Sequence, residues 1–180
     1  MQSRALRHAL ATLAAALCLL SLTADAAHSL CTQPGDHARD FTLTDLQGNP
    51  VALSDYDGKV VMMVFWASWC SRCREEMEFL QDLSSRLADD VVVLAINQET
   101  ENVDPAHLEK LRADVAQMGL EFPVLLDTDL QVWGAYCVNA LPTSIIVGRQ
   151  GQIAFAEPNY YWASQDNLTA ALRDLDALHD

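Results

Sequence analysis

Basic residues are scarce in this chain of 180 residues: 11 lysines and arginines stand against 25 aspartates and glutamates. The formal net charge is therefore −14 at pH 7. Such acidity disfavours nucleic acid and anionic lipid as partners, because both carry negative charge themselves. We expect no nucleic-acid partner, and we expect most of the carboxylates to serve solubility.

A long apolar run is also missing. The Leu- and Ala-rich stretch Ala9–Ala24 has only 16 residues, whereas a membrane helix needs about 18 or more. Two arginines precede this stretch, and the small-x-small tripeptide Ala24-Asp25-Ala26 ends it, which is the pattern of a cleavable secretory signal. We predict a signal peptide over residues 1–26, one domain over residues 27–180, a periplasmic location and no membrane span after cleavage. The alternative is that the N-terminal segment stays as an anchor.

The chain has five cysteines, and the first of them, Cys18, leaves with the predicted signal peptide. The four that remain are Cys31, Cys70, Cys73 and Cys137. Disulfides persist outside the cytosol, so Cys31 and Cys137 could form a structural disulfide; alternatively, Cys137 is a free thiol. A zinc site needs a second ligand pair at comparable spacing, which is absent, so we expect no metal and no cofactor.

Cys70 and Cys73 are separated by two residues where a strand pattern changes to a helix pattern. The apolar run Val60–Trp66 predicts a strand buried on both faces. From Cys70 to about Ala88, apolar residues recur at three- and four-residue spacing, which predicts a helix. Cys70 then lies at a helix N-terminus, where free N–H groups and the helix dipole favour a thiolate. Cys73 follows one turn later, close enough for a disulfide.

Two other uses of a cysteine pair do not fit these residues. Haem attachment requires a histidine after the second cysteine, and Arg74 stands there. The Thr-x-x-Cys setting of a peroxiredoxin's reactive cysteine is missing as well.

The rest of the chain alternates between strand and helix patterns. In the first half we predict coil up to residue 39, a β-hairpin over 40–45 and 51–53, a buried strand over 91–97 and a polar loop over 99–103. In the second half we predict a helix over 104–118, a short extended stretch over 122–126 and a short helix over 129–136. A hairpin over 144–147 and 152–155 and a last helix over 163–178 follow. Asp104 and Pro105 suit the start of the middle helix, and we expect His107 on its polar face to be a surface histidine. This order predicts a three-layer α/β domain.

With the motifs placed, the chain resembles the thioredoxin superfamily, most closely the TlpA/ResA/CcmG-like thiol–disulfide oxidoreductases. The matching segments are Phe41–Gly48, Gly58–Glu76, Phe122–Asp127, Leu141-Pro142-Thr143 and Arg149–Gly151. The resemblance implies a thioredoxin-like fold: a central mixed β-sheet flanked by helices, with an N-terminal β-hairpin and an inserted helical segment.

The resemblance also implies roles for the residues of the redox motif. Cys70 matches the nucleophile and Cys73 the resolving thiol of a redox-active disulfide. Glu76 matches an acidic residue that serves as proton acceptor or donor; the alternative is an ordinary solvated helix residue. Val64 stands where thioredoxins carry a buried aspartate, so we hypothesise that Glu76 takes on more of the proton handling.

A second group of residues matches the substrate-binding positions of the family. Pro142 corresponds to the cis-proline that faces the disulfide, and Leu141 and Thr143 flank it. Trp69 corresponds to the aromatic residue next to the nucleophile. We therefore predict that Trp69, Leu141, Pro142 and Thr143 contact the substrate.

The resemblance predicts a monomeric enzyme that reduces disulfides in exported client proteins, for example during cytochrome c or metalloprotein maturation. A membrane thiol–electron carrier is the expected reductant. Two alternatives remain at this point: a thiol oxidase or isomerase that uses the same residues, and a non-catalytic chaperone or metal-delivery module on this fold.

Overall fold

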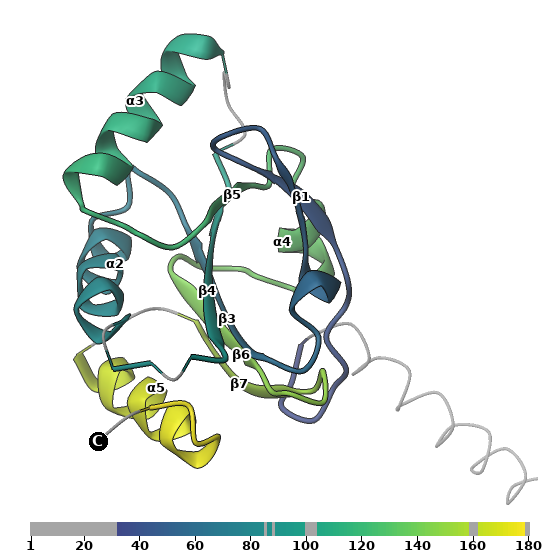
Figure 1. The fold of residues 1–180 in the computed structure, drawn as a ribbon. Helices are drawn as coiled ribbons and strands as arrows, with labels where there is room; N and C mark the ends of the chain where they lie inside the picture. Colours follow the sequence, from purple (N-terminus) through teal and green to yellow (C-terminus); the bar gives the residue numbers. More distant parts are fainter. Residues whose placement is uncertain (1–31, 85, 88, 100–103, 159–161, 179–180) are drawn as a thin grey trace, which may run out of the picture. The chain divides into compact units, whose positions relative to one another are not determined.

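Two parallel strands, β3 (Val60–Trp66) and β4 (Val91–Asn97), form the centre of a seven-stranded sheet with the order β2-β1-β5-β4-β3-β6-β7 (Figure 1). The other strands are β1 (Thr42–Asp45), β2 (Pro50–Ala52), β5 (Val124–Leu126), β6 (Thr143–Val147) and β7 (Ile153–Pro158). Strand β5 continues the parallel set, and β6, β7, β1 and β2 pair antiparallel. The computed structural model describes residues 32–84, 86–87, 89–99, 104–158 and 162–178. The predicted mixed sheet is confirmed.

Helices cover both faces of the sheet. Helices α2 (Ser71–Ser84), α3 (Pro105–Gln117) and α5 (Trp162–Asp174) lie along one face, and the short helix α4 (Gln131–Ala135) lies on the other (Figure 1). A single turn of 3-10 helix, η2 (Leu53–Tyr56), follows β2. The three-layer α/β architecture and the helix inserted between β4 and β5 are therefore as expected.

Strand β3 shows why an uninterrupted apolar run is needed at the centre. Its side chains alternate between two hydrophobic clusters: Val60, Met62, Val64 and Trp66 pack with α2, α3 and α5, and Val61, Met63 and Phe65 pack with α4. Every residue of the strand is buried. A polar side chain at any of these positions would need a buried partner.

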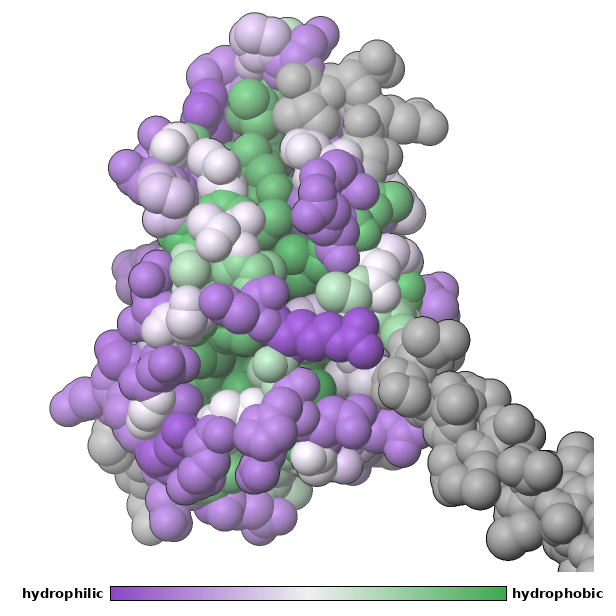
Figure 2. Space-filling view, turned by 90° about the vertical axis from the view of Figure 1, so that its right-hand side faces the viewer, coloured by the Kyte–Doolittle hydropathy of each residue, from purple (hydrophilic) through white to green (hydrophobic). Residues whose placement is uncertain are grey.

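The second face of the sheet carries the short helix α4 and the 3-10 turn η2. Half-buried hydrophobic residues border the cluster on this face: Ala38, Phe41, Leu43, Val51, Tyr56 and Trp133. Figure 2 turns the side that carries β1 and α4 toward the viewer and shows apolar surface running between polar residues. The segment before β1 is tied to this face, because Tyr136 at the end of α4 donates its hydroxyl to the Arg39 carbonyl at 2.6 Å.

Several predicted boundaries were wrong by a few residues. Helix α2 ends at Ser84 rather than near residue 88, and the lead-in before residue 39 is more than coil. His37 bridges to Gln152, and the amide of Ala38 donates to the Gly151 carbonyl at 2.9 Å. Helix α3 begins as predicted, because Asp104 accepts the backbone N–H of His107 at 2.8 Å.

Candidate active site

The two cysteines lie where β3 passes into α2. A tight turn connects the two elements, closed by a hydrogen bond from the Cys70 amide to the Ala67 carbonyl at 3.1 Å. Cys70 and Cys73 form a disulfide, with their Cα atoms 5.3 Å apart. Cys73 is fully buried, whereas Cys70 is half-buried. A molecule arriving from solvent therefore reaches the sulfur of Cys70 first.

The amide of Cys73 points at the Cys70 sulfur, 3.2 Å away. This N–H belongs to the first turn of α2, whose amides have no partner within the helix. Such a donor stabilises negative charge on sulfur. The geometry supports the prediction that Cys70 is the thiol that carries a thiolate in the reduced protein.

The Leu141–Pro142 peptide bond is cis, as the resemblance implies. Pro142 is buried, and Thr143 begins β6 opposite Phe65 of β3. The Thr143 hydroxyl donates to the Ala140 carbonyl at 2.8 Å. Because β3 and β6 are neighbours, the proline loop and the Cys70 turn leave the sheet at adjacent positions.

The two tryptophans near the motif differ sharply in exposure. Trp66 is fully buried in the cluster on the α2 face, and its indole nitrogen has no hydrogen-bond partner. Trp69, although large and hydrophobic, is 71% exposed. Trp69 is therefore free to contact another protein, and Trp66 is part of the core.

Glu76 is buried rather than solvated. It is 3% exposed and lies one helical turn after Cys73 on the inner face of α2. The Ser144 hydroxyl donates to its Oε1, and its Oε2 has no partner. Burial raises the pKa of Glu76 to about 7; the Ser144 hydrogen bond opposes this shift, and the charge of Glu157 adds to it.

Val64 lies on β3 opposite the serine that contacts Glu76. Val64 is fully buried in β3 and pairs in register with Ser144 of β6. The strand therefore contributes a methyl-bearing side chain where thioredoxins have an acid, and the neighbouring strand contributes a hydroxyl that reaches Glu76. Sequence reasoning did not identify Ser144, because its contact with Glu76 spans 68 residues of sequence.

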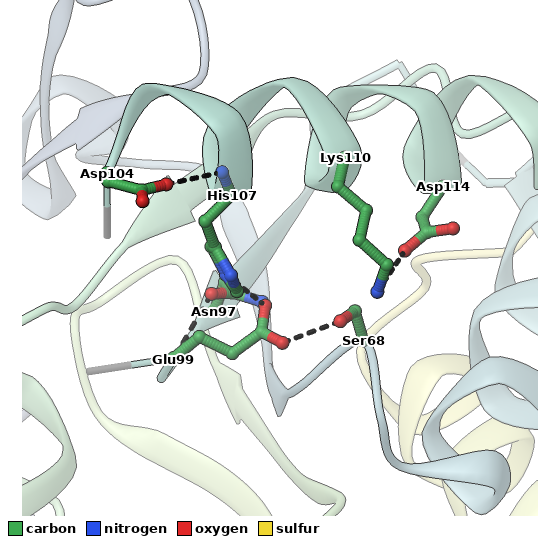
Figure 3. Close-up of polar contacts among 7 residues, drawn as sticks. All are labelled: Ser68, Asn97, Glu99, Asp104, His107, Lys110 and Asp114. Atoms are coloured by element: carbon green, nitrogen blue, oxygen red, sulfur yellow. Dashed lines mark hydrogen bonds and ion pairs between the residues drawn. The ribbon is translucent and has the colours of Figure 1, made fainter. Parts of the chain in front are cut away.

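A second buried glutamate lies just beyond the end of β4 (Figure 3). Glu99 is 8% exposed, and its Oε1 accepts the hydroxyl of Ser68 at 2.6 Å. Its Oε2 accepts the side-chain amide of Asn97 at 2.9 Å and lies 3.6 Å from Nε2 of His107. His107, expected to be a surface histidine, is half-buried, and its Nε2 faces Glu99 without a hydrogen-bond partner. Glu99 itself was expected in a polar loop.

The remaining cysteines are only partly described. Cys137 is half-buried, has a positive φ of 53° and has no disulfide partner among the described residues. Cys31 lies outside the described residues, so the Cys31–Cys137 disulfide stays a prediction. Within residues 32–178 and outside the gaps named above, no cluster of three histidine, cysteine, aspartate or glutamate side chains has the geometry to hold a metal ion. None of the helices described there is long and apolar enough to cross a membrane.

A thioredoxin-like sheet, a Cys-x-x-Cys disulfide at the start of the helix after its central strand, and a cis-proline before the next antiparallel strand together define a thiol–disulfide oxidoreductase. Comparison with known proteins agrees. The family model described as the AhpC/TSA family matches residues 34–156. The chain is 32% identical over 122 residues to the thiol–disulfide oxidoreductase ResA of Bacillus thuringiensis, an alignment that covers 67% of each chain.

Two solved structures are similar in fold. One is a putative thiol:disulfide interchange protein DsbE from Chlorobium tepidum, with a TM-score of 0.68, 30% identity, and coverage of 80% of this chain and 98% of that one. The other is a secreted Mycobacterium tuberculosis disulfide oxidoreductase homologous to E. coli DsbE, with a TM-score of 0.63, 26% identity, and coverage of 75% and 96%. The chain belongs to the AhpC/TSA family and, within the thioredoxin superfamily, to its ResA/CcmG-like thiol–disulfide oxidoreductases.

Proposed function

We propose that this enzyme works outside the cytoplasm as a reductase of disulfides in exported client proteins. The observation that carries the proposal is the arrangement of three groups at the start of α2: half-buried Cys70 just before the helix, buried Cys73 bonded to it, and buried Glu76 one turn further on. An attacking thiol, a resolving thiol and a group able to exchange a proton are the parts that the reaction needs.

In the reduced enzyme, the Cys70 thiolate attacks one sulfur of the client disulfide. A bond forms between Cys70 and that sulfur, the client's S–S bond breaks, and the other client sulfur leaves as a thiolate and takes up a proton. The thiol of Cys73 then loses its proton and attacks Cys70 Sγ, which releases the second client sulfur. The client gains two electrons, and the enzyme is left with the Cys70–Cys73 disulfide.

Glu76 is proposed to accept the proton that Cys73 loses and to return it to the departing client thiolate. A general acid–base group works best when its pKa is close to the working pH. The pKa of Glu76 is raised to about 7, so both protonation states are present near neutral pH. Glu76 therefore takes the place of the acid that Val64 removes from β3.

The client is proposed to bind across Trp69 and the loop of Leu141, Pro142 and Thr143. Exposed Trp69 offers apolar contact area, and the backbone of the proline loop is proposed to pair with an extended segment of the client. The signal-like pattern of residues 1–26, which lie outside the described residues, and the secreted neighbour from Mycobacterium tuberculosis support an extracytoplasmic, periplasmic location.

The clients that we propose are apocytochrome c or metalloproteins during assembly, whose cysteines must be reduced before they bind their ligand. Reduction of the Cys70–Cys73 disulfide after each turnover requires a thiol–electron carrier in the membrane. We propose that the enzyme acts as a monomer. Cys31 and Cys137 are proposed to form a structural disulfide, which peptide mapping after alkylation without reduction tests.

The proposal is tested with serine variants of the two motif cysteines. Cys70→Ser should abolish the reduction of insulin disulfides, and Cys73→Ser should trap mixed disulfides with clients. Glu121→Gln, which removes an exposed carboxylate outside the motif, should retain wild-type activity as the control. In cells, Cys70 and Cys73 should be mainly reduced. A mainly oxidised pair would instead indicate an oxidase, and a Cys70→Ser variant that supports the wild-type phenotype would show that the function is not catalytic.

A further inference from the structure

Glu99 connects the active-site turn to the end of the neighbouring strand. Ser68 lies two residues before Cys70, inside the turn between β3 and α2, and its hydroxyl donates to Glu99 Oε1 at 2.6 Å. The same two chain segments are joined by their backbones, since the amide of Gln98 donates to the Trp66 carbonyl at 3.1 Å. Parallel strands bring their carboxyl ends to one edge of a sheet, so β3 and β4 place the turn and Glu99 side by side.

Glu99 is itself held on several sides. Asn97 makes two hydrogen bonds to Glu99. Its Nδ2 donates to Glu99 Oε2 at 2.9 Å, and its Oδ1 accepts the Glu99 backbone amide at 3.1 Å. His107 of α3 places Nε2 3.6 Å from the same Oε2. Lys110, on the same helix, is paired with Asp114 at 3.7 Å (Figure 3). Both oxygens of the Glu99 side chain thus have partners despite their burial.

The contacts exclude a serine-nucleophile triad. In such a triad the histidine lies between the hydroxyl and the acid. Here the Ser68 hydroxyl donates directly to the carboxylate, and the imidazole contacts the other oxygen. The arrangement orients a hydroxyl and does not activate it.

We propose that Glu99 is a positioning residue for thiol–disulfide exchange: through the Ser68 hydroxyl it holds the turn that presents Cys70 at the start of α2. Its carboxylate is fixed from the other side by the side-chain amide of Asn97, and His107 of the inserted helix lies beside it without a hydrogen bond. The expected effect on kcat/KM rests on the proposed function. The two residues concerned, Ser68 and Glu99, lie outside the Cys-x-x-Cys motif.

The physical argument is one of preorganisation. The thiolate of Cys70 gains stability only while its sulfur stays next to the free amides of the first turn of α2. A hydrogen bond that fixes the turn keeps the sulfur there before a client arrives, so less ordering is required during the reaction. A hydrogen bond to a charged group is strong enough for an effect of about tenfold.

The test uses Ser68→Ala, Ser68→Thr and Glu99→Gln in the full-length protein, with Glu121→Gln as a control that removes one exposed carboxylate. Two readouts are taken on the reduced protein: the pH midpoint of Cys70 alkylation, and kcat/KM for insulin reduction. We expect Ser68→Ala to raise the alkylation midpoint and to lower kcat/KM about tenfold. Ser68→Thr, which keeps the hydroxyl, should restore both values, and Glu121→Gln should match wild type. We expect Glu99→Gln to lower kcat/KM. The double variant Ser68→Ala/Glu99→Gln should have the same kcat/KM as Ser68→Ala alone.

The inference is overturned if Ser68→Ala changes only the urea midpoint of unfolding and leaves the alkylation midpoint and kcat/KM within twofold of wild type. It is also overturned if Ser68→Thr does not restore the alkylation midpoint. If Glu99→Gln does not fold, the two Ser68 variants decide, because they leave the carboxylate and its other contacts in place. Alkylation needs no client, so it reports on Glu99 and Ser68 even if wild type reduces no protein disulfide.

Discussion

Two buried glutamates lie near the active-site turn, and they differ in how many hydrogen bonds their carboxylate oxygens accept. Glu76 in α2 receives one hydrogen bond, from Ser144, and its second oxygen has no partner. Glu99 beyond β4 receives hydrogen bonds on both oxygens, from Ser68 and Asn97, and has His107 close by. Both are less than one-tenth exposed.

The difference teaches how burial can serve either chemistry or structure. Removing a carboxylate from water penalises its charged form unless hydrogen bonds replace the lost solvation. Glu76 lacks half of that replacement, and its pKa rises to about 7, so both of its protonation states are present near neutral pH, as the proposed proton transfer requires. Both oxygens of Glu99 accept hydrogen bonds, which connect the turn before α2 to the end of β4. Asp127 is a third case: it is fully buried and accepts the amides of Val132 and Trp133 at the start of α4.

The largest expected effect is on how stability depends on pH. The pKa of Glu76 is about 7 in the folded protein against an ordinary value of 4.5, so the folded state holds this proton more tightly than the unfolded chain. The stabilisation is fully present below about pH 4.5 and is lost as pH rises through 7. Relative to Glu76→Gln, wild type should lose about 3 kcal/mol of unfolding free energy between these limits, measured by urea unfolding of the oxidised proteins.

In that experiment the other acidic groups titrate equally in both proteins, and their effect cancels in the difference. Parallel stability curves for wild type and Glu76→Gln would contradict a raised pKa for Glu76. The comparison with Glu99 would then lose its basis.

The next effect is on catalysis. Glu76→Gln preserves the shape of the side chain and an acceptor for Ser144, but it removes the exchangeable proton. We expect kcat for insulin reduction at pH 7 to fall by about 10²-fold, the lower end of the usual range for general acid–base groups. Glu78→Gln, on an exposed position of the same helix, is the matched control and should stay within about twofold. Equal activities of the two variants would assign proton transfer to another group.

The smallest of the three effects concerns the structural carboxylate. Asp127→Ala leaves the first amides of α4 unpaired in a buried place, and we expect a loss of about 2 kcal/mol in unfolding free energy. The alkylation midpoint of Cys70 should not change. Asp89→Ala, which removes an exposed aspartate, should leave stability nearly unaltered. A changed alkylation midpoint in Asp127→Ala would show that Asp127 affects the Cys70 thiol as well as the stability of the fold.

Patterns that are local in the sequence were predictable. The apolar run of β3, the capped start of α3 at Asp104 and the Cys-x-x-Cys helix follow from residue spacing alone. Helix ends and the pairing of His37 with Gln152 were missed, because they depend on tertiary contacts rather than on local propensity.

The partners of the buried carboxylates were not predictable in the same way. Ser144 reaches Glu76 across 68 residues, and Ser68 reaches Glu99 across 31. Glu99 was interpreted as part of a polar loop, since a lone acid after a strand is usually solvated. One signal was present: Glu99 closely follows the carboxyl end of a buried strand parallel to β3, at the edge where Cys70 lies.

The central claim is that Glu76 is the group that exchanges a proton with the dithiol. Its most direct test is a pH titration of the carboxyl carbon of Glu76 by NMR, assigned by comparison with Glu76→Gln, in the oxidised and the reduced protein. We predict a midpoint near the value of about 7 set by burial in the oxidised form, and a different midpoint once the thiols of Cys70 and Cys73 are present. A midpoint near the ordinary glutamate value of 4.5 in both forms would contradict the account.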